Sequence, residues 1–188
     1  RLVFAMRDEH GRRSNAKLRW SSRSDLKSRQ LPNYLVPQVR KVLVFGSIPN
    51  AVKARRIIVV EGEADWASVQ SVVDAETVVI GASNNSAMVK TLEVIAARID
   101  PVTGPDVVVC PDNQATALEF ANIGIEHLKR AGVRVRLARL SHDREDIGDV
   151  LEMDGIKTVL SVLDSAADVG SRALDLKTAR AELNTAVD

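Results

Sequence analysis

The second half of the chain alternates short apolar runs with segments in which apolar residues recur every three or four positions. Residues 57–60 are all apolar, as expected for a strand buried on both faces of a sheet. Strands are also predicted over 77–81 and 106–110, where apolar residues fill 78–80 and 107–110. Apolar and basic residues alternate over 133–137, which predicts an edge strand with one solvent-facing side.

Helical periodicity fills the intervals between these runs. One predicted helix has an apolar face with spacings of four, three and four, formed by Met88, Leu92, Ile95 and Ile99. A second has an apolar face with spacings of three, four and three, formed by Leu118, Ala121, Ile125 and Leu128. Gly132 is expected to end the second helix, and a further helix is predicted over 65–73. Strands alternating with helices predict an α/β fold with a four-stranded parallel sheet and flanking helices.

The first 56 residues have a different pattern. A small β unit is predicted from alternating apolar and polar residues over 2–6, a turn at 8–11 and a return strand at 17–20. A polar, basic loop is expected to follow over 21–30. Three prolines and Gly46 between 31 and 53 predict short elements and turns. We expect a basic N-terminal subdomain over 1–56, an α/β domain over 57–155, and a C-terminal helical segment over 156–188, with an amphipathic helix at 173–187.

Charge is distributed unevenly between these parts. Residues 1–56 carry 14 Lys or Arg against 3 Asp or Glu, a net of +11, whereas 57–188 carry 12 against 22, a net of −10. A solvated basic surface would explain the excess, but its size and position favour a polyanion as partner.

Cysteine content and hydropathy exclude several classes of protein. Cys110 is the one cysteine, so neither an intrachain disulfide nor a cysteine-based zinc site can form. The sequence contains no run of 18 apolar residues, so no membrane span is predicted. The first residues resemble neither a signal peptide nor a transit peptide. We expect a cytoplasmic protein, or a fragment of a longer one.

Carboxylates follow three of the predicted strands. Glu61 comes directly after the first, Asp112 two residues after the third, and Asp146 beyond the fourth. The carboxyl ends of parallel strands share one edge of a sheet, where ligands of such folds bind. Oxygen ligands suit Mg²⁺, which can orient a phosphate and activate a hydroxyl. The sequence therefore predicts a magnesium site that includes Glu61 and Asp112, while Asp146 fits a ligand and a helix cap about equally.

Other polar residues near the strand ends fit structural roles better. Glu63, Asp65 and Asp149 are more simply explained as helix caps or first-turn charges. In the segment 81–86, backbone N–H groups could hold a phosphate, but Ser86 as a helix N-cap is the preferred interpretation.

These motifs resemble those of a known family. The segment from Ile57 through Glu61, Gly62, Glu63 and Asp65 is similar to the opening motif of the Toprim domain, in the version found in phage and plasmid primases. Asp112 lies where the family has its Asp-x-Asp motif, and Asp146 matches its later acidic position. Segments 1–11 and 45–49 resemble, more weakly, the basic template-binding subdomain upstream of Toprim in DnaG-like primases.

The sequence departs from the family where the second aspartate of Asp-x-Asp is expected. Gln114 stands there, and its amide oxygen brings no charge to a metal. The resemblance implies Glu61, Asp112, Gln114 and Asp146 as metal ligands, Glu61, Asp112 and Asp146 as catalytic residues, and Mg²⁺, or Mn²⁺, as cofactor. The loss of one carboxylate puts two-metal polymerase chemistry in doubt.

The leading hypothesis is the Toprim core of a primase-like replication protein that joins nucleoside triphosphates on a single-stranded DNA template, with a possible helicase partner or domain. The basic half would hold the template through Arg7, Arg12, Arg13, Lys17, Arg19, Trp20, Arg23 and Lys27. Two alternatives remain: a non-catalytic nucleic-acid-binding module with a degenerate site, and a Toprim nuclease.

Overall fold

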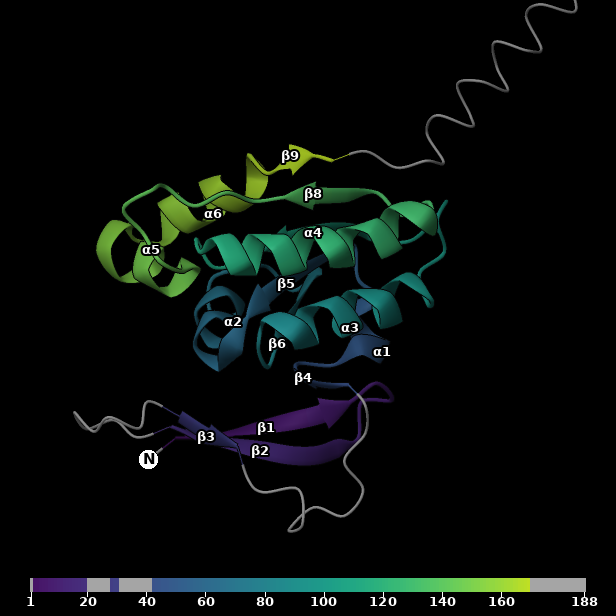
Figure 1. Ribbon diagram of the computed structural model, residues 1–188, viewed down its shortest axis with the longest axis horizontal. Helices are drawn as coiled ribbons and strands as arrows, with labels where there is room; N and C mark the ends of the chain where they lie inside the picture. Colours follow the sequence, from purple (N-terminus) through teal and green to yellow (C-terminus); the bar gives the residue numbers. More distant parts are fainter. Residues whose placement is uncertain (1, 20–27, 31–41, 170–188) are drawn as a thin grey trace, which may run out of the picture.

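The computed structural model describes residues 2–19, 28–30 and 42–169. Within them one mixed sheet of nine strands has the order β3-β2-β1-β4-β6-β5-β7-β8-β9 (Figure 1). The strands are β1 (Leu2–Asp8), β2 (Arg13–Arg19), β3 (Ser28–Gln30), β4 (Leu43–Phe45), β5 (Arg56–Glu61), β6 (Thr77–Ala82), β7 (Asp106–Cys110), β8 (Val135–Leu137) and β9 (Ala167–Asp168). The helices are α1 (Ile48–Ala51), α2 (Gly62–Gln70), α3 (Asn85–Ala96), α4 (Ala115–Arg130), α5 (Ile147–Asp154) and α6 (Ile156–Asp164).

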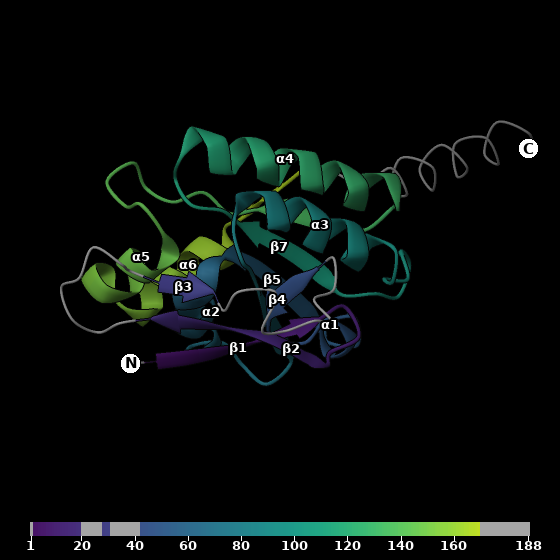
Figure 2. The ribbon, with the colours of Figure 1, turned by 60° about the horizontal axis from the view of Figure 1, so that its bottom comes forward.

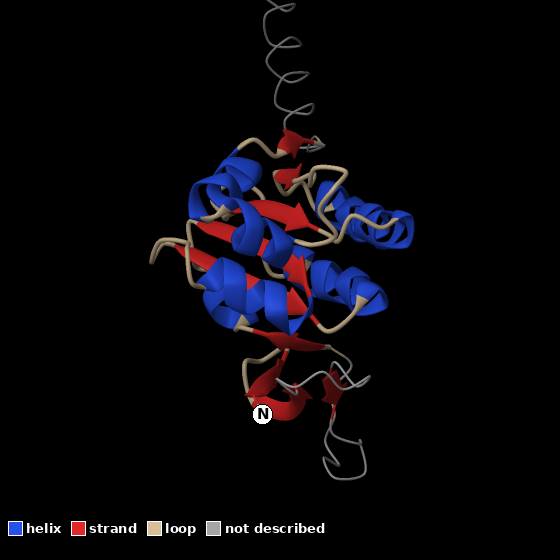
Figure 3. Cartoon of the chain, turned by 90° about the vertical axis from the view of Figure 1, so that its left-hand side faces the viewer, coloured by secondary structure: helices blue, strands red, loops and turns tan. Residues whose placement is uncertain are grey.

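The central strands β6, β5, β7 and β8 are parallel, which confirms the four-stranded parallel sheet predicted from the sequence. Helices cover both of its faces, with α3 and α4 on one side and α2, α5 and α6 on the other (Figure 3). Alternate residues of β5 enter different cores: Ile57 and Val59 pack with α3 and α4, and Ile58 and Val60 with the opposite helices. This double burial explains the unbroken apolar run.

The two predicted helical faces are buried as expected except at Leu118, which is only partly buried, while the neighbouring Ala117 is buried. Met88, Leu92 and Ile95 lie in the core beneath α3, and Ala121, Ile125 and Leu128 lie beneath α4. Gly132 follows the last turn of α4 with φ of +76°, as a helix-ending glycine does. The first helix begins three residues earlier than predicted, because Gly62 lets the chain turn from β5 directly into α2.

The N-terminal strands extend the same sheet rather than forming a separate layer (Figure 2). β1 and β2 form the predicted antiparallel hairpin, and its turn is closed by a hydrogen bond from the Gly11 N–H to the Asp8 carbonyl at 2.9 Å. The short, fully buried β4 joins β1 to β6, antiparallel to both. Met6, Leu43 and Phe45 form a small core there, on which Phe4 and Trp66 pack.

Two local predictions were wrong. The strand at 133–137 is not an edge, because β9 pairs antiparallel with β8, and the Arg136 side chain is 16% exposed and paired with Asp106. The cap of α3 is Asn84 rather than Ser86: the Asn84 Oδ1 accepts the Ala87 N–H at 2.9 Å, and the Ser86 hydroxyl donates to the same oxygen at 2.8 Å. The expected helix over 173–187 lies outside the described residues.

Candidate active site at the carboxyl edge of the sheet

The order of the parallel strands places a topological switch point at the carboxyl ends of β5 and β7. The chain leaves β5 through α2 toward β6 on one side, then crosses by α3 to β7 on the other side. Where successive connections diverge in this way, an open α/β sheet binds its ligands. Glu61 ends β5 and Asp112 follows β7 by two residues, so both carboxylates stand at this switch point.

Glu61 is the last residue of β5 and the N-cap residue of α2. Gly62 has φ of +84°, a backbone conformation that other residues adopt only with strain. The sharp turn leaves the Glu61 carboxylate half-buried at the strand end. In its chemically sensible orientation, the Asn85 amide group donates to both Glu61 carboxylate oxygens, at 2.8 Å to Oε1. Burial raises the pKa of Glu61, and the charge of Lys17 opposes that rise.

Asp112 lies in the exit of β7, half-buried behind Pro111. Burial, followed by the charges of Glu61 and Asp146, raises the pKa of Asp112 to about 7.

Asp65 comes from the first turn of α2 and is 6% exposed. Burial, followed by the charges of Asp146 and Asp112, raises the pKa of Asp65 to about 8.

Asp65 therefore belongs to the same electrostatic group as the strand-end carboxylates. Its Oδ1 accepts the Gly148 N–H at 3.2 Å, so it also joins α2 to the start of α5. The preferred interpretation from sequence was a plain first-turn charge, and its position in the first turn is as expected. Its proximity to Asp146 could not be predicted, because it depends on where α5 docks.

Asp146 reaches the group from the loop that precedes α5. It is the N-cap of α5, and its Oδ1 accepts the Asp149 N–H at 2.8 Å. Asp149 in turn accepts the Glu145 N–H at 3.3 Å. Asp146 is thus a helix cap and, through its charge on Asp65 and Asp112, a member of the acidic group.

The residues expected beside these carboxylates do not all join them. Gln114 is exposed at the N-cap position of α4, and its side chain makes no capping hydrogen bond. Glu63 is buried and forms an ion pair with Lys17 at 2.7 Å.

The four carboxylates Glu61, Asp65, Asp112 and Asp146, called here the acidic group, suit a cation electrostatically. Burial, and after it repulsion by the neighbouring carboxylates, raises the pKa of Asp65 to about 8 and that of Asp112 to about 7. Among the described residues, however, no three His, Cys, Asp or Glu side chains converge as a ready-made metal site. Mg²⁺ needs fewer protein ligands than that, because one or two carboxylates usually hold it together with water and substrate phosphates.

Solved structures with the same architecture include bacterial and phage primases. A crystal structure of the Aquifex aeolicus primase, comprising zinc-binding and RNA polymerase domains, matches with a TM-score of 0.66 at 18% identity, over 97% of this chain and 44% of that one. A DnaG primase catalytic domain bound to single-stranded DNA matches with a TM-score of 0.67 at 16% identity, over 88% of this chain and 51% of that one. The chain has the fold of a DnaG-type primase core.

A phage structure matches the same primase core fold. The primase fragment of the bacteriophage T7 primase-helicase protein has a TM-score of 0.58 at 18% identity, covering 86% of this chain and 61% of that one. The chain spans about half the length of the bacterial primases named above. No protein-family model matches the sequence, and no characterised protein matches it significantly.

The basic residues of the primase-like N-terminal strands are partly engaged within the protein. Arg12 pairs with Asp8 at 3.0 Å, and Arg7 donates to the Gly11 carbonyl at 2.8 Å. Arg13 is exposed, whereas Lys17 is directed toward Glu63 and the acidic group. Arg19 lies in β2, and the side-chain contacts predicted for it fall outside what the structure describes, as do Trp20, Arg23 and Lys27.

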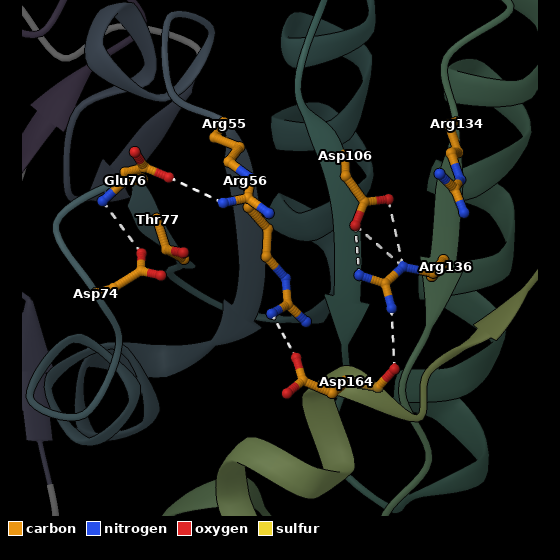
Figure 4. A pocket seen from close by; sticks show the side chains of 9 residues that line it. All are labelled: Arg55, Arg56, Asp74, Glu76, Thr77, Asp106, Arg134, Arg136 and Asp164. Atoms are coloured by element: carbon orange, nitrogen blue, oxygen red, sulfur yellow. Dashed lines mark hydrogen bonds and ion pairs between the residues drawn. The ribbon is translucent and has the colours of Figure 1, made fainter.

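A hollow of about 500 Å³ lies at the opposite, amino-terminal edge of the parallel strands (Figure 4). Its arginines and acids are mutually paired: Arg56 bonds Asp164 at 2.7 Å, and Arg136 pairs with Asp106 and donates to the Asp164 carbonyl at 3.1 Å. Arg56 also donates to the Leu163 carbonyl at 2.6 Å. These bonds hold the end of α6 to the sheet. The charged residues of this hollow therefore have a structural role, and they lie at the opposite edge from the acidic group.

Two asparagines of the primase-fold site were not among the residues predicted from sequence. Asn85 holds Glu61, and Asn113 holds the loop that carries Asp146. Asn85 sits at the start of a predicted helix, and Asn113 is adjacent to a candidate ligand, so their positions gave a weak signal. Their partners, however, come from segments remote in sequence.

No described helix is long and apolar enough to cross a membrane.

Proposed function

We propose that this chain is the Toprim-containing core of a primase-like replication protein, which joins nucleoside triphosphates on a single-stranded DNA template. The observation that carries the proposal is the acidic group at the switch point of a primase-type sheet. Among the matching structures, a DnaG catalytic domain is bound to single-stranded DNA.

Glu61 and Asp112 would hold Mg²⁺, with Asp146 assisting and water or phosphate completing the ligand set. Bound there, the ion would neutralise phosphate charge and favour ionisation of an attacking hydroxyl. Asn85 fixes the rotamer of Glu61, so that one carboxylate is presented in a defined direction. Asp65, buried behind the edge with a pKa of about 8, holds a proton near neutrality and would ionise when a cation binds beside it.

The basic N-terminal part would bind the template beside this edge. Lys17 links the two regions, since it belongs to β2 and pairs with Glu63 in α2. Arg13, exposed at the other end of the hairpin, is available for phosphate contacts, whereas the neighbouring Arg12 is also paired with Asp8. A helicase partner or domain is part of the proposal, because the T7 fragment that matches comes from a primase-helicase.

The test is template-dependent nucleotide incorporation by a protein that contains the whole chain. We compare wild type, Glu61→Gln and Gln114→Asp in Mg²⁺ and in Mn²⁺. The wild type should be weakly active and prefer Mn²⁺, which accepts mixed ligands more readily. Gln114→Asp should strengthen metal binding and raise synthesis, and Glu61→Gln should abolish synthesis while DNA binding persists.

The alternative outcome is equally specific. If neither wild type nor Gln114→Asp incorporates nucleotides while both bind DNA, the chain is a non-catalytic binding module. Metal-dependent cleavage of DNA without incorporation would instead identify a nuclease.

A further inference from the structure

The segment between β8 and α5, residues 138–146, carries Asp146 to the acidic group without a helix or strand of its own. Its first residue is anchored by the Ala138 N–H, which donates to the Val109 carbonyl at 2.9 Å. Its last residue, Asp146, caps α5. Between these points the position of the segment, called here the Asp146 loop, depends on side-chain hydrogen bonds.

Asn113 supplies three of the bonds that hold this loop. Its backbone N–H donates to the Glu145 carbonyl at 2.7 Å. Its side-chain amide donates to the carbonyls of Ser141 at 3.0 Å and Arg144 at 3.1 Å. An asparagine amide has two N–H donors, and both are used here on carbonyls of one turn. Asn113 therefore binds the loop at both ends of the turn that the Arg144 N–H closes on the Ser141 carbonyl.

The place of Asn113 in the chain gives these bonds a consequence for the site. It directly follows Asp112, so the segment after β7 carries one carboxylate of the acidic group and holds the loop that carries another. Arg144 is held independently by a bidentate ion pair with Asp154, in which each N···O distance is 2.8 Å. That pair ties the loop to the end of α5, whereas Asn113 ties it to the end of β7.

We propose that Asn113 is a positioning residue that sets Asp146 against Asp112 by holding the Asp146 loop to the end of β7. Its side chain acts through the loop backbone and touches none of the four carboxylates. An aspartate could not replace it, because an ionised carboxylate offers no donor to the two carbonyls and would repel them. The inference that metal binding depends on Asn113 rests on the proposed function; the inference that it holds the loop does not.

The test measures two properties of Asn113→Ala and Asn113→Asp. Amide hydrogen exchange should accelerate roughly tenfold for residues 141–149, since two hydrogen bonds are lost, while β5 and β7 keep their protection. The Asp149 amide is the most direct reporter, because it is bonded to the Asp146 carboxylate. Mn²⁺ affinity, followed by electron paramagnetic resonance, should fall roughly fivefold for alanine and further for aspartate.

A double-mutant cycle distinguishes positioning from general destabilisation. In an Asp146→Asn background, which keeps a helix cap, Asn113→Ala should weaken Mn²⁺ binding no further. Asp100→Ala is the matched control: it also removes two side-chain hydrogen bonds, to the Val102 and Thr103 amides at 2.8 and 3.0 Å, but in a turn that precedes β7. It should leave both exchange in 141–149 and Mn²⁺ affinity unchanged.

The outcomes separate this inference from the proposed function. Unchanged exchange in 141–149, or additive effects of Asn113→Ala and Asp146→Asn on Mn²⁺ affinity, would overturn the positioning role. Failure of the wild type to bind Mn²⁺ would count against the proposed metal-dependent function, and the Asp149 amide would still decide whether Asn113 places Asp146.

Discussion

Lys17 in β2 and Glu63 in α2 form a largely buried ion pair 2.7 Å long between the basic hairpin and the parallel core. Their side chains are 17% and 5% exposed. Removal of one partner leaves the other charge poorly solvated, so Lys17→Met and Glu63→Gln should each lower the free energy of unfolding by about 2–3 kcal/mol. The double mutant should lose less than the sum, with a coupling of about 1 kcal/mol or more, in chemical denaturation. Additive losses would show that the pair contributes nothing.

The acidic group should make stability depend on pH in an unusual direction. The pKa of Asp65 is raised from 3.8 to about 8, so the folded protein binds a proton that the unfolded chain releases. Stability from this residue is complete below about pH 4 and is lost as pH rises toward 8. Relative to Asp65→Asn, the wild type should lose about 2 kcal/mol or more over that window, since one pKa unit corresponds to about 1.4 kcal/mol.

The measurement is denaturant unfolding of both proteins at intervals from pH 5 to 9, and the quantity of interest is the difference between them. Subtracting the variant removes the contribution of other titrating groups. A difference that does not change with pH would mean that Asp65 ionises normally in the folded protein. Added Mg²⁺ should flatten the wild-type dependence if a cation binds the acidic group.

The turn that positions Glu61 depends on close backbone contact with β6. A Cβ at Gly81 would lie 2.7 Å from the Gly62 carbonyl oxygen and 2.8 Å from the Trp66 Cβ, neither of which is a flexible side-chain tip. Gly81→Ala should therefore destabilise the fold by about 1–3 kcal/mol and displace the start of α2. Thermal unfolding measures the loss. A wild-type melting temperature would show that this approach is looser than described.

The basic N-terminal part should dominate binding to single-stranded DNA. Reversal of Arg12, Arg13, Arg19 and Arg23 to glutamate should weaken binding more than about tenfold and reduce its dependence on salt, because fewer counterions are released. The control reverses four basic residues remote from the hairpin, namely Lys90, Lys129, Arg130 and Arg134. Fluorescence anisotropy over a salt series compares the two proteins. Equal losses would mean that net charge, rather than the hairpin, accounts for binding.

The parallel core could be predicted from sequence because its signals are local. The apolar run of β5 and the spaced apolar residues of α3 and α4 reflect burial that each element shows by itself. Glu61 and Asp112 could be placed at one edge for the same reason, since the ends of parallel strands coincide. The structure brings them within electrostatic reach of each other, while their role as metal ligands stays a prediction.

The parts that could not be predicted depend on partners remote in sequence. β9 has two exposed residues and no apolar pattern, yet it converts β8 from an edge into an inner strand. β4 is a strand of three residues, too short for alternation to be visible. Asp65 interacts with Asp146 because α5 docks on α2, a contact that nothing near Asp65 in the sequence indicates.

The pairing of β4 with both β1 and β6 has a mechanical consequence. Backbone hydrogen bonds continue without a break from the basic hairpin to the strand beside Glu61. A hinge between the two regions would have to break that ladder, so a template held by the hairpin would keep a constant offset from the acidic group. Any movement that accompanies turnover would fall to segments outside the ladder, such as the Asp146 loop, and advance along the template would require the strand of DNA to slide rather than the protein to bend.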